Sequence, residues 1–219
     1  MISLLHPSRG RPEKSFNNAK EWIEKAGCDV ELIVSIDNSD AWKAYFDLYP
    51  PYPHEPIGSY IRLYMNDNDS VVQATNRAAK QATGDILLYL SDDFKCFDNW
   101  GLSVLKEFEG EDRPLLLKVD DCLQKFQVPV LTIPIMNRKL YERLGYFWHP
   151  EYKSMFVDED LYWTAQKLNA MKMCSHLKFE HHHAANGKAP DDETYRRSAA
   201  NWDQGKSVYQ RRKAEGFPV

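Results

Sequence analysis

The chain has 219 residues, of which 43% are apolar and 27% are charged, and its formal net charge is −4. A chain of this length is sufficient for one sizeable hydrophobic core, so we expect a single α/β domain. The mildly acidic balance argues against a protein that binds along a nucleic-acid backbone or on an anionic membrane surface.

The cysteines and the first residues bear on the compartment of the protein. The four cysteines are far apart and form no CxxC pair, which favours a reduced chain over a disulfide framework or a zinc ribbon. The opening sequence ISLLH resembles a strand and has neither the basic region nor the long apolar core of a signal peptide or a membrane span. We therefore expect a cytoplasmic protein without a membrane span.

The first part of the chain alternates between strand-like and helix-like patterns. Short apolar runs predict strands over 2–5, 30–36, 59–65 and 86–90. Apolar residues at helical spacing predict helices over 12–26, around 42–46 and over 71–82, and the Pro-rich segment 49–56 is expected to be an irregular loop. This order, with no shift in composition, is typical of an α/β fold.

The second part of the chain continues the pattern with longer interruptions. We expect helices over 100–108 and 137–144, strands over 115–119, 128–135 and 172–179, and a helix that residues 156–160 lead into. Residues 146–155 form an aromatic loop without clear periodicity. The polar sequence from Asp191 onward is predicted to be partly helical and to lie over the body.

The sequence GDILLYLSDD, residues 84–93, is the stretch around which we expect the fold to be organised. Its apolar run indicates a central strand, and ligands of open α/β sheets bind at the carboxyl ends of such strands. The adjacent carboxylates of Asp92 and Asp93 repel each other unless a cation lies beside them, which points to a hard divalent metal. The alternative is that they cap a helix beginning near Phe97.

Charged residues also follow the first two predicted strands. Arg9 and Arg11 lie in the first loop, where they would meet a nucleotide base or phosphate, and the simpler interpretation is that both are solvated. Asp37 follows the second strand, so that two parallel strands place acids along one edge of the sheet. Asp40 is a candidate N-cap of the next helix.

Three clusters of acids or histidines, at 91–93, 158–160 and 181–183, lie at strand ends or helix starts. The second has a structural alternative, which is favourable negative charge at a helix N-terminus. The third cluster also has a structural alternative, which is a solvated histidine-rich loop or a histidine buried in the core. Because strand-end clusters of one α/β sheet tend to converge, we expect the three clusters to meet at one site.

The motifs ISLLHPSRGRP, VSIDNSD, QATNRAAKQATGDILLYLSDD, FVDEDLYWTAQKL and FEHHH follow one another in the chain. In this order they resemble the GT-A-fold glycosyltransferases, especially the family-2 type that use a nucleotide-diphosphate sugar. The most specific part is the helix with Asn76 and Arg77 that leads into the acidic strand end. The resemblance implies a single Rossmann-like GT-A domain over 1–183, with 184–219 as a C-terminal extension that packs on the body or forms a lid.

The resemblance implies a nucleotide side of the site. Pro7, Ser8 and Arg9 match the loop that borders the nucleotide, and Asp37 matches the acid that contacts the base. Asp92 would contact the ribose. The residues implied for binding the nucleotide sugar are thus Pro7, Ser8, Arg9, Asp37, Asn76 and Asp92.

The resemblance also implies a metal site for Mn²⁺ or Mg²⁺. Asp93 would be the acidic ligand and His181 the late histidine that completes the site, with His183 as the second choice. The family's usual Asp-x-Asp motif has Ser91 in place of its first acid here, so this motif offers one carboxylate fewer to a metal. An imidazole ligand favours Mn²⁺.

The catalytic base of inverting family members matches Asp158, and Asp160 is the acid of the acidic-apolar pair behind it. A shift of register would make Glu159 or Asp160 the base instead. The implied reaction moves a sugar from a nucleotide-diphosphate sugar, a UDP-sugar being the first expectation, to an acceptor hydroxyl. The acceptor is unknown, with saccharides and modified nucleic acids among the candidates.

Three other functions remain as alternatives. A sugar-1-phosphate nucleotidyltransferase shares the acidic α/β site, but the loop 6–12 has one glycine and little phosphate-cradling character. A non-catalytic nucleotide- or carbohydrate-binding module of the same fold would explain the missing acid at Ser91. A zinc hydrolase built on residues 181–183 is disfavoured, because adjacent side chains of an extended segment point in alternating directions.

Overall fold

The computed structural model describes residues 1–37, 42–49, 60–189 and 193–219. Within these residues the main sheet has the strand order β3-β2-β1-β4-β7-β6-β8. Neighbouring strands are parallel except at β7, which is antiparallel to both β4 and β6. The strands of this sheet are β1 (Ile2–Ser8), β2 (Val30–Asp37), β3 (Tyr60–Asn66), β4 (Ile86–Tyr89), β6 (Leu116–Asp120), β7 (Ile135–Asn137) and β8 (Met171–Lys178).

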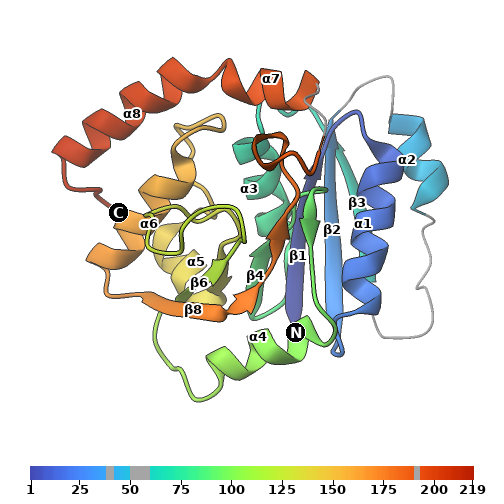
Figure 1. Ribbon diagram of the computed structural model, residues 1–219, viewed down its shortest axis with the longest axis horizontal. Helices are drawn as coiled ribbons and strands as arrows, with labels where there is room; N and C mark the ends of the chain where they lie inside the picture. The colour runs from blue at the N-terminus through green and yellow to red at the C-terminus, as the bar shows by residue number, and fades with distance from the viewer. Residues whose placement is uncertain (38–41, 50–59, 190–192) are drawn as a thin grey trace.

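Helices cover both faces of the sheet, so that the described residues form three layers (Figure 1). One face packs against α1 (Pro12–Glu24), α2 (Trp42–Leu48) and α4 (Trp100–Phe108). The other face packs against α3 (Val71–Gln81), α5 (Arg138–Leu144) and α6 (Val157–Lys167). The predicted α/β fold, with a mostly parallel sheet flanked by helices, is confirmed.

Local sequence explains where several helices begin and end. The Ser70 side chain caps α3 by accepting a hydrogen bond from the Gln73 N–H, and Asn137 caps α5 by accepting one from the Leu140 N–H. The α5 helix ends at Gly145, whose φ of 75° lies in the left-handed region that glycine adopts without strain. The helices predicted over 100–108 and 137–144 agree closely with the observed α4 and α5.

The strand expected over 128–135 is wrong for most of its length, since only residue 135 belongs to β7. The preceding backbone takes an irregular path because side chains satisfy its carbonyl groups. The buried Lys118 ammonium donates to Val128 O and Val130 O, at 2.9 and 2.5 Å. The apolar run does not reveal that a lysine far away in the chain donates the hydrogen bonds that a neighbouring strand would otherwise donate.

The capping interpretation of Asp92 and Asp93 is also wrong. The α4 helix begins at Trp100 with Asn99 at the cap position. The two acids instead precede β5 (Phe94–Lys95), which pairs with β9 (Glu180–His181) outside the main sheet. The expected cap at Asp40 and the loop 50–56 lie outside the described residues.

The last part of the chain contains a 3₁₀ turn (Ala184–Asn186), α7 (Glu193–Ala199) and α8 (Trp202–Ala214). The α8 helix packs against α6, and Val208 and Tyr209 contact the edge of the core on that face. Figure 1 shows α7 and α8 along one side of the molecule, with α7 above the carboxyl ends of β1 and β2. The division into units 1–183 and 184–219 stays a prediction. None of the described helices combines the length and the apolar character needed to span a bilayer.

Candidate functional site

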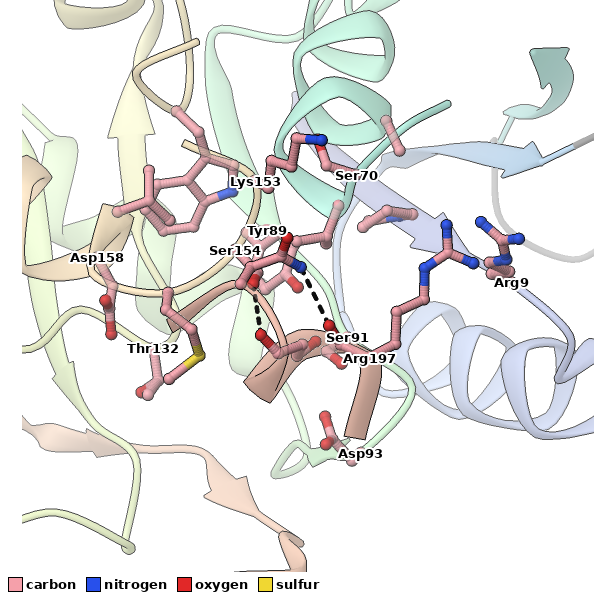
Figure 2. A pocket seen from close by; sticks show the side chains of 18 of the residues that line it. Arg9, Ser70, Tyr89, Ser91, Asp93, Thr132, Lys153, Ser154, Asp158 and Arg197 are labelled. Carbon is pink, nitrogen blue, oxygen red and sulfur yellow. Dashed lines mark hydrogen bonds between the residues drawn. The ribbon is translucent and has the colours of Figure 1, made fainter. Parts of the chain in front are cut away.

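A pocket of about 360 Å³ opens at the carboxyl ends of β1, β2 and β4. This is the edge at which open α/β sheets bind ligands. Figure 2 shows side chains from distant parts of the chain around it, among them Arg9, Asp93, Asp158 and Arg197. The predicted site residues that line the pocket are Pro7, Ser8, Arg9, Asp37, Asp92, Asp93, Asp158, His181 and His183.

The ends of β1 and β2 form one side of the pocket. Arg9 and Asp37 form a salt bridge of 2.8 Å across these two strand ends, and Asp37 is the more buried partner. The hydroxyl groups of Ser8 and Tyr45 lie 2.7 Å apart, and the backbone N–H of Arg11 donates to the same Tyr45 oxygen. The β1 loop is therefore fixed against α2 at the pocket edge.

The two adjacent carboxylates after β4 have different partners. Asp92 is buried and lies 2.9 Å from the Arg11 guanidinium and 3.3 Å from the Lys14 ammonium. Asp93 instead faces His181, with 3.3 Å between Asp93 Oδ2 and His181 Nε2. Because cations of α1 and its loop neutralise Asp92, only Asp93 directs its carboxylate toward the histidine cluster.

The pairing of β5 with β9 brings Asp93 and His181 together. Phe94 pairs with His181 in this ladder, and the His182 N–H donates to Asp93 O at 2.8 Å. The His181 and His183 rings lie 5.0 Å apart, whereas His182 turns away and contacts Glu180 at 2.9 Å. The expectation that neighbouring histidines of this segment point in alternating directions is met.

The pair of Asp93 and His181 has the chemistry of a site for Mn²⁺ or Mg²⁺. A carboxylate and an imidazole lie in contact at the pocket wall, and His181 Nδ1 is buried without a hydrogen-bond partner in the described ranges. Burial, and then the neighbouring His181 ring, lower the pKa of His183 and favour its neutral, ligating form. No group of three or more His, Cys, Asp or Glu side chains in the described part is placed to hold a metal. A metal ion held by this pair would therefore take its remaining ligands from water or from a bound ligand, as is usual for Mg²⁺ sites.

Asp158 lies in the first turn of α6 and lines the pocket. It is half-buried, and this burial raises the pKa of its carboxyl above the usual range for aspartate. The charge of Lys118 acts in the opposite direction and lowers this pKa, while that of Asp121 raises it. A carboxyl group with a raised pKa beside a ligand pocket is suited to accept a proton near neutral pH.

Asp160 does not line the pocket, although it lies in the same helical turn as Asp158. Its carboxylate is buried and contacts Arg212 of α8 at 2.6 Å and the Tyr152 hydroxyl at 2.9 Å. The arrangement gives Asp160 a structural contact with the C-terminal helix. Of the three acids at 158–160, Asp158 alone lines the pocket.

Asn76 does not line the pocket either. Its side chain accepts hydrogen bonds from the N–H groups of Phe147 and Trp148 and donates to Trp148 O. Trp148 lines the pocket, with its ring 5.6 Å from that of Tyr89. Asn76 thus holds the aromatic loop 146–155 in place, and its predicted contact with the nucleotide sugar is not part of this arrangement.

Several residues that line the pocket were not assigned to the site from sequence. They include Arg197, Ser198 and Asn201 of the C-terminal extension and Lys153 of the aromatic loop. From sequence, Arg197 is one of several C-terminal cations that could meet a phosphate, with a solvated surface charge as the favoured interpretation. No local pattern distinguishes it from its neighbour Arg196, since the position of α7 depends on contacts with residues far away in the chain.

No protein-family model and no curated protein matches this sequence. The mannosyltransferase PcManGT from Pyrobaculum calidifontis, solved in complex with GDP-Man and Mn²⁺, is 14% identical, with a TM-score of 0.68 over 96% of this chain and 64% of that structure. GalNAc-T7, solved with UDP, GalNAc and Mn²⁺, is 13% identical, with a TM-score of 0.60 over 83% of this chain and 43% of that structure. S. aureus TarS is 15% identical, with a TM-score of 0.55 over 82% of this chain and 36% of that structure.

These similarities show the fold of the chain, which is the GT-A fold of glycosyltransferases. The chain spans between 36% and 64% of the length of these three structures. The predicted GT-A fold is therefore confirmed.

Proposed function

We propose that the protein is a metal-dependent glycosyltransferase that moves a sugar from a nucleotide-diphosphate sugar to an acceptor hydroxyl with inversion at the anomeric carbon. The observation that carries the proposal is the convergence in one pocket of the Arg9–Asp37 strand ends, the Asp93–His181 pair and Asp158. The GT-A fold supports it, since solved structures with that fold include a mannosyltransferase bound to GDP-Man and Mn²⁺.

The donor nucleotide would lie against the ends of β1 and β2. Pro7, Ser8 and Arg9 would border the base, and Asp37, which the Arg9 guanidinium holds at 2.8 Å, would accept its hydrogen bonds. Asp92 would accept a hydrogen bond from a ribose hydroxyl, while the Arg11 guanidinium stabilises the charge of the carboxylate. We propose a UDP-sugar first and a GDP-sugar second. The saccharide or modified nucleic acid acceptor stays a prediction.

Asp93 and His181 would hold the metal, with His183 beside them. Mn²⁺ is proposed over Mg²⁺ because imidazole is a better ligand for the softer ion. The bound ion would supply Lewis-acid stabilisation of the diphosphate that leaves. The protein's part is to keep the carboxylate and the imidazole aligned through the β5–β9 ladder.

Asp158 would act as the general base. Its carboxylate would remove the proton of the acceptor hydroxyl as that oxygen forms the new bond to the anomeric carbon, and the bond from this carbon to the diphosphate oxygen breaks on the opposite side. The configuration is thereby inverted. Burial raises the pKa of Asp158, which improves its match to a base that works near neutral pH.

The proposal is tested by thermal-shift titration of UDP- and GDP-sugars with Mn²⁺ or with EDTA. At least one nucleotide sugar is expected to raise the melting temperature of the wild type, more strongly with Mn²⁺. Asp93→Asn and His181→Ala are expected to lose the Mn²⁺-dependent part. His182→Ala is the matched control, because His182 turns away toward Glu180. If no nucleotide sugar binds, or if Asp93→Asn keeps the full Mn²⁺ effect, the proposal is wrong.

A further inference from the structure

The C-terminal extension contributes directly to the wall of the candidate site. Arg197 and Ser198 of α7 and the following Asn201 line the pocket together with Asp93 and Asp158. Figure 2 shows the Arg197 side chain on the same side of the pocket as Arg9, whereas Lys153 lies on the side of Ser70. Arg197 is therefore on the side of the pocket where the nucleotide is proposed to bind.

A set of contacts fixes the extension to residues 151–160. The Ser154 hydroxyl donates to Ser198 O at 3.1 Å, and the Gln204 side-chain amide donates to Glu151 O at 2.7 Å. Further along α8, the buried Arg212 forms an ion pair with Asp160. Because both ends of this segment are fastened to residues 151–160, the position of Arg197 at the pocket is defined by the fold.

Arg197 differs from the other arginines of the pocket in its partners. Arg9 is paired with Asp37 and Arg11 with Asp92, so each of these charges is already balanced by a carboxylate. The Arg197 guanidinium forms no ion pair with any residue in the ranges that the structure describes, and it is exposed at the pocket. It therefore has its positive charge available for a ligand.

We propose that Arg197 binds the diphosphate of the donor and of the nucleoside diphosphate product. A diphosphate bears more negative charge than a divalent ion bound by a carboxylate neutralises, and no other cation on the nucleotide side of the described pocket is without an acidic partner. The planar guanidinium matches the geometry of phosphate oxygens and donates two parallel hydrogen bonds. The extension is then part of the donor site.

This inference rests on the proposed function, and its test separates the two. Binding of UDP and GDP with Mn²⁺, and of uridine and guanosine, is measured by isothermal titration calorimetry. Arg197→Ala is expected to weaken binding of the diphosphate by about tenfold or more, the scale of a charge-assisted hydrogen bond. Binding of the uncharged nucleoside is expected to stay unchanged, and Arg197→Lys is expected to be intermediate.

Arg196→Ala is the matched control, because Arg196 is the exposed neighbour of Arg197 on α7 and does not line the pocket. This variant is expected to bind both ligands as the wild type does. If Arg197→Ala binds the diphosphate as tightly as Arg196→Ala does, the inference is wrong while the proposed function stands. If the wild type binds neither diphosphate with Mn²⁺, the proposed function fails and the inference fails with it.

Discussion

Asp158 and Asp160 belong to the same turn of α6, and their surroundings differ in a way that assigns them different roles. Asp158 lines the pocket, and burial raises its pKa. Asp160 is directed to the other side, where Arg212 and Tyr152 contact its carboxylate. A single turn thus holds both the proposed base and the anchor of the C-terminal helix.

Asp158→Asn is expected to lower the transfer rate by about 10²- to 10⁴-fold, the range typical of a lost general base. In the wild type, kcat/KM should rise with pH through the raised pKa of Asp158, because only the ionised carboxylate accepts the proton. A raised carboxyl pKa also means that the wild type loses stability as the pH rises. The variant should therefore melt at a higher temperature than the wild type at pH 7, but not below pH about 3.9. Normal turnover by the variant would contradict the assignment.

Asp160→Asn is expected to have the opposite signature. Removing one partner of a buried ion pair leaves Arg212 without its counter-charge, which costs about 3–5 kcal/mol of unfolding free energy. Any activity that remains at low temperature should keep the wild-type pH profile. Denaturant unfolding and a pH–rate profile measure the two effects. A variant of normal stability with an altered pH profile would show that Asp160, and not Asp158, is the base.

The sequence was informative about residues next to strand ends and uninformative about their partners. Because parallel strands align their carboxyl ends, Asp37 and Asp93 could be placed at one edge from the order of the elements, whereas Asp158 was placed there by the resemblance. The ion pair of Asp160 with Arg212 could not, because it joins α6 to a helix whose position no local pattern determines. The role of Asn76 in holding the aromatic loop was missed for the same reason.

At the scale of elements, Glu31 ties β2 to its neighbours. Its fully buried carboxylate accepts hydrogen bonds from Ser3, Thr83 and Gly84 and pairs with Arg62 of β3 at 2.7 Å. Burial alone would raise the pKa of Glu31, but these hydrogen bonds outweigh burial and lower the pKa. A carboxyl with a lowered pKa stabilises the fold above its unfolded pKa, and the stabilisation is lost as the pH falls through the folded value.

Glu31→Gln is therefore expected to lower the free energy of unfolding by roughly 3 kcal/mol at pH 7. The difference from the wild type should shrink as the pH falls below about 4.3, where the Glu31 carboxyl of the unfolded chain begins to take up its proton. Glu24→Gln is the control, since Glu24 is exposed on α1 and its variant should stay within about 0.5 kcal/mol of the wild type. Urea unfolding at several pH values measures this, and a constant difference at all pH values would contradict the account.

The packing of α8 on the aromatic loop gives a second prediction for elements. A Cβ atom at Gly205 would collide with Met155 O, so the helix can approach this loop only with glycine at that position. Helix propensity alone favours alanine by about 1 kcal/mol. We expect the collision to prevail, so that Gly205→Ala destabilises the protein by about 1–3 kcal/mol. Thermal unfolding of Gly205→Ala is compared with that of the control Ser207→Ala, at an exposed position of α8. A Gly205→Ala variant that melts at or above the wild-type temperature would contradict the prediction.

Most helices and strands followed from apolar periodicity because their buried faces are regular. The exceptions are segments whose backbone is satisfied by side chains. The stretch 128–134 is apolar enough for a strand, yet Lys118 and Asp121 fix its path through contacts with Val130 O and Thr132. Short pairings such as β5 with β9 also lack a periodic signal, although this one aligns Asp93 with His181.

At the scale of the whole molecule, the fold creates the site by convergence. The main sheet aligns the ends of β1, β2 and β4, the β5–β9 ladder adds the histidines, and the extension adds Arg197. The sequence predicted the first two contributions through the order of its motifs. The sequence left open whether the extension packs on the body or covers the site, because its position depends on long-range packing.

The most direct test of the account is the release of nucleoside diphosphate from the nucleotide sugar that the protein binds best. With that donor saturating and water as acceptor, we expect slow hydrolysis when Mn²⁺ is present and none in EDTA. Asp93→Asn should abolish the release at any Mn²⁺ concentration that supports the wild type. Tight donor binding without any Mn²⁺-dependent release would contradict glycosyl transfer and identify a non-catalytic binding module of the same fold.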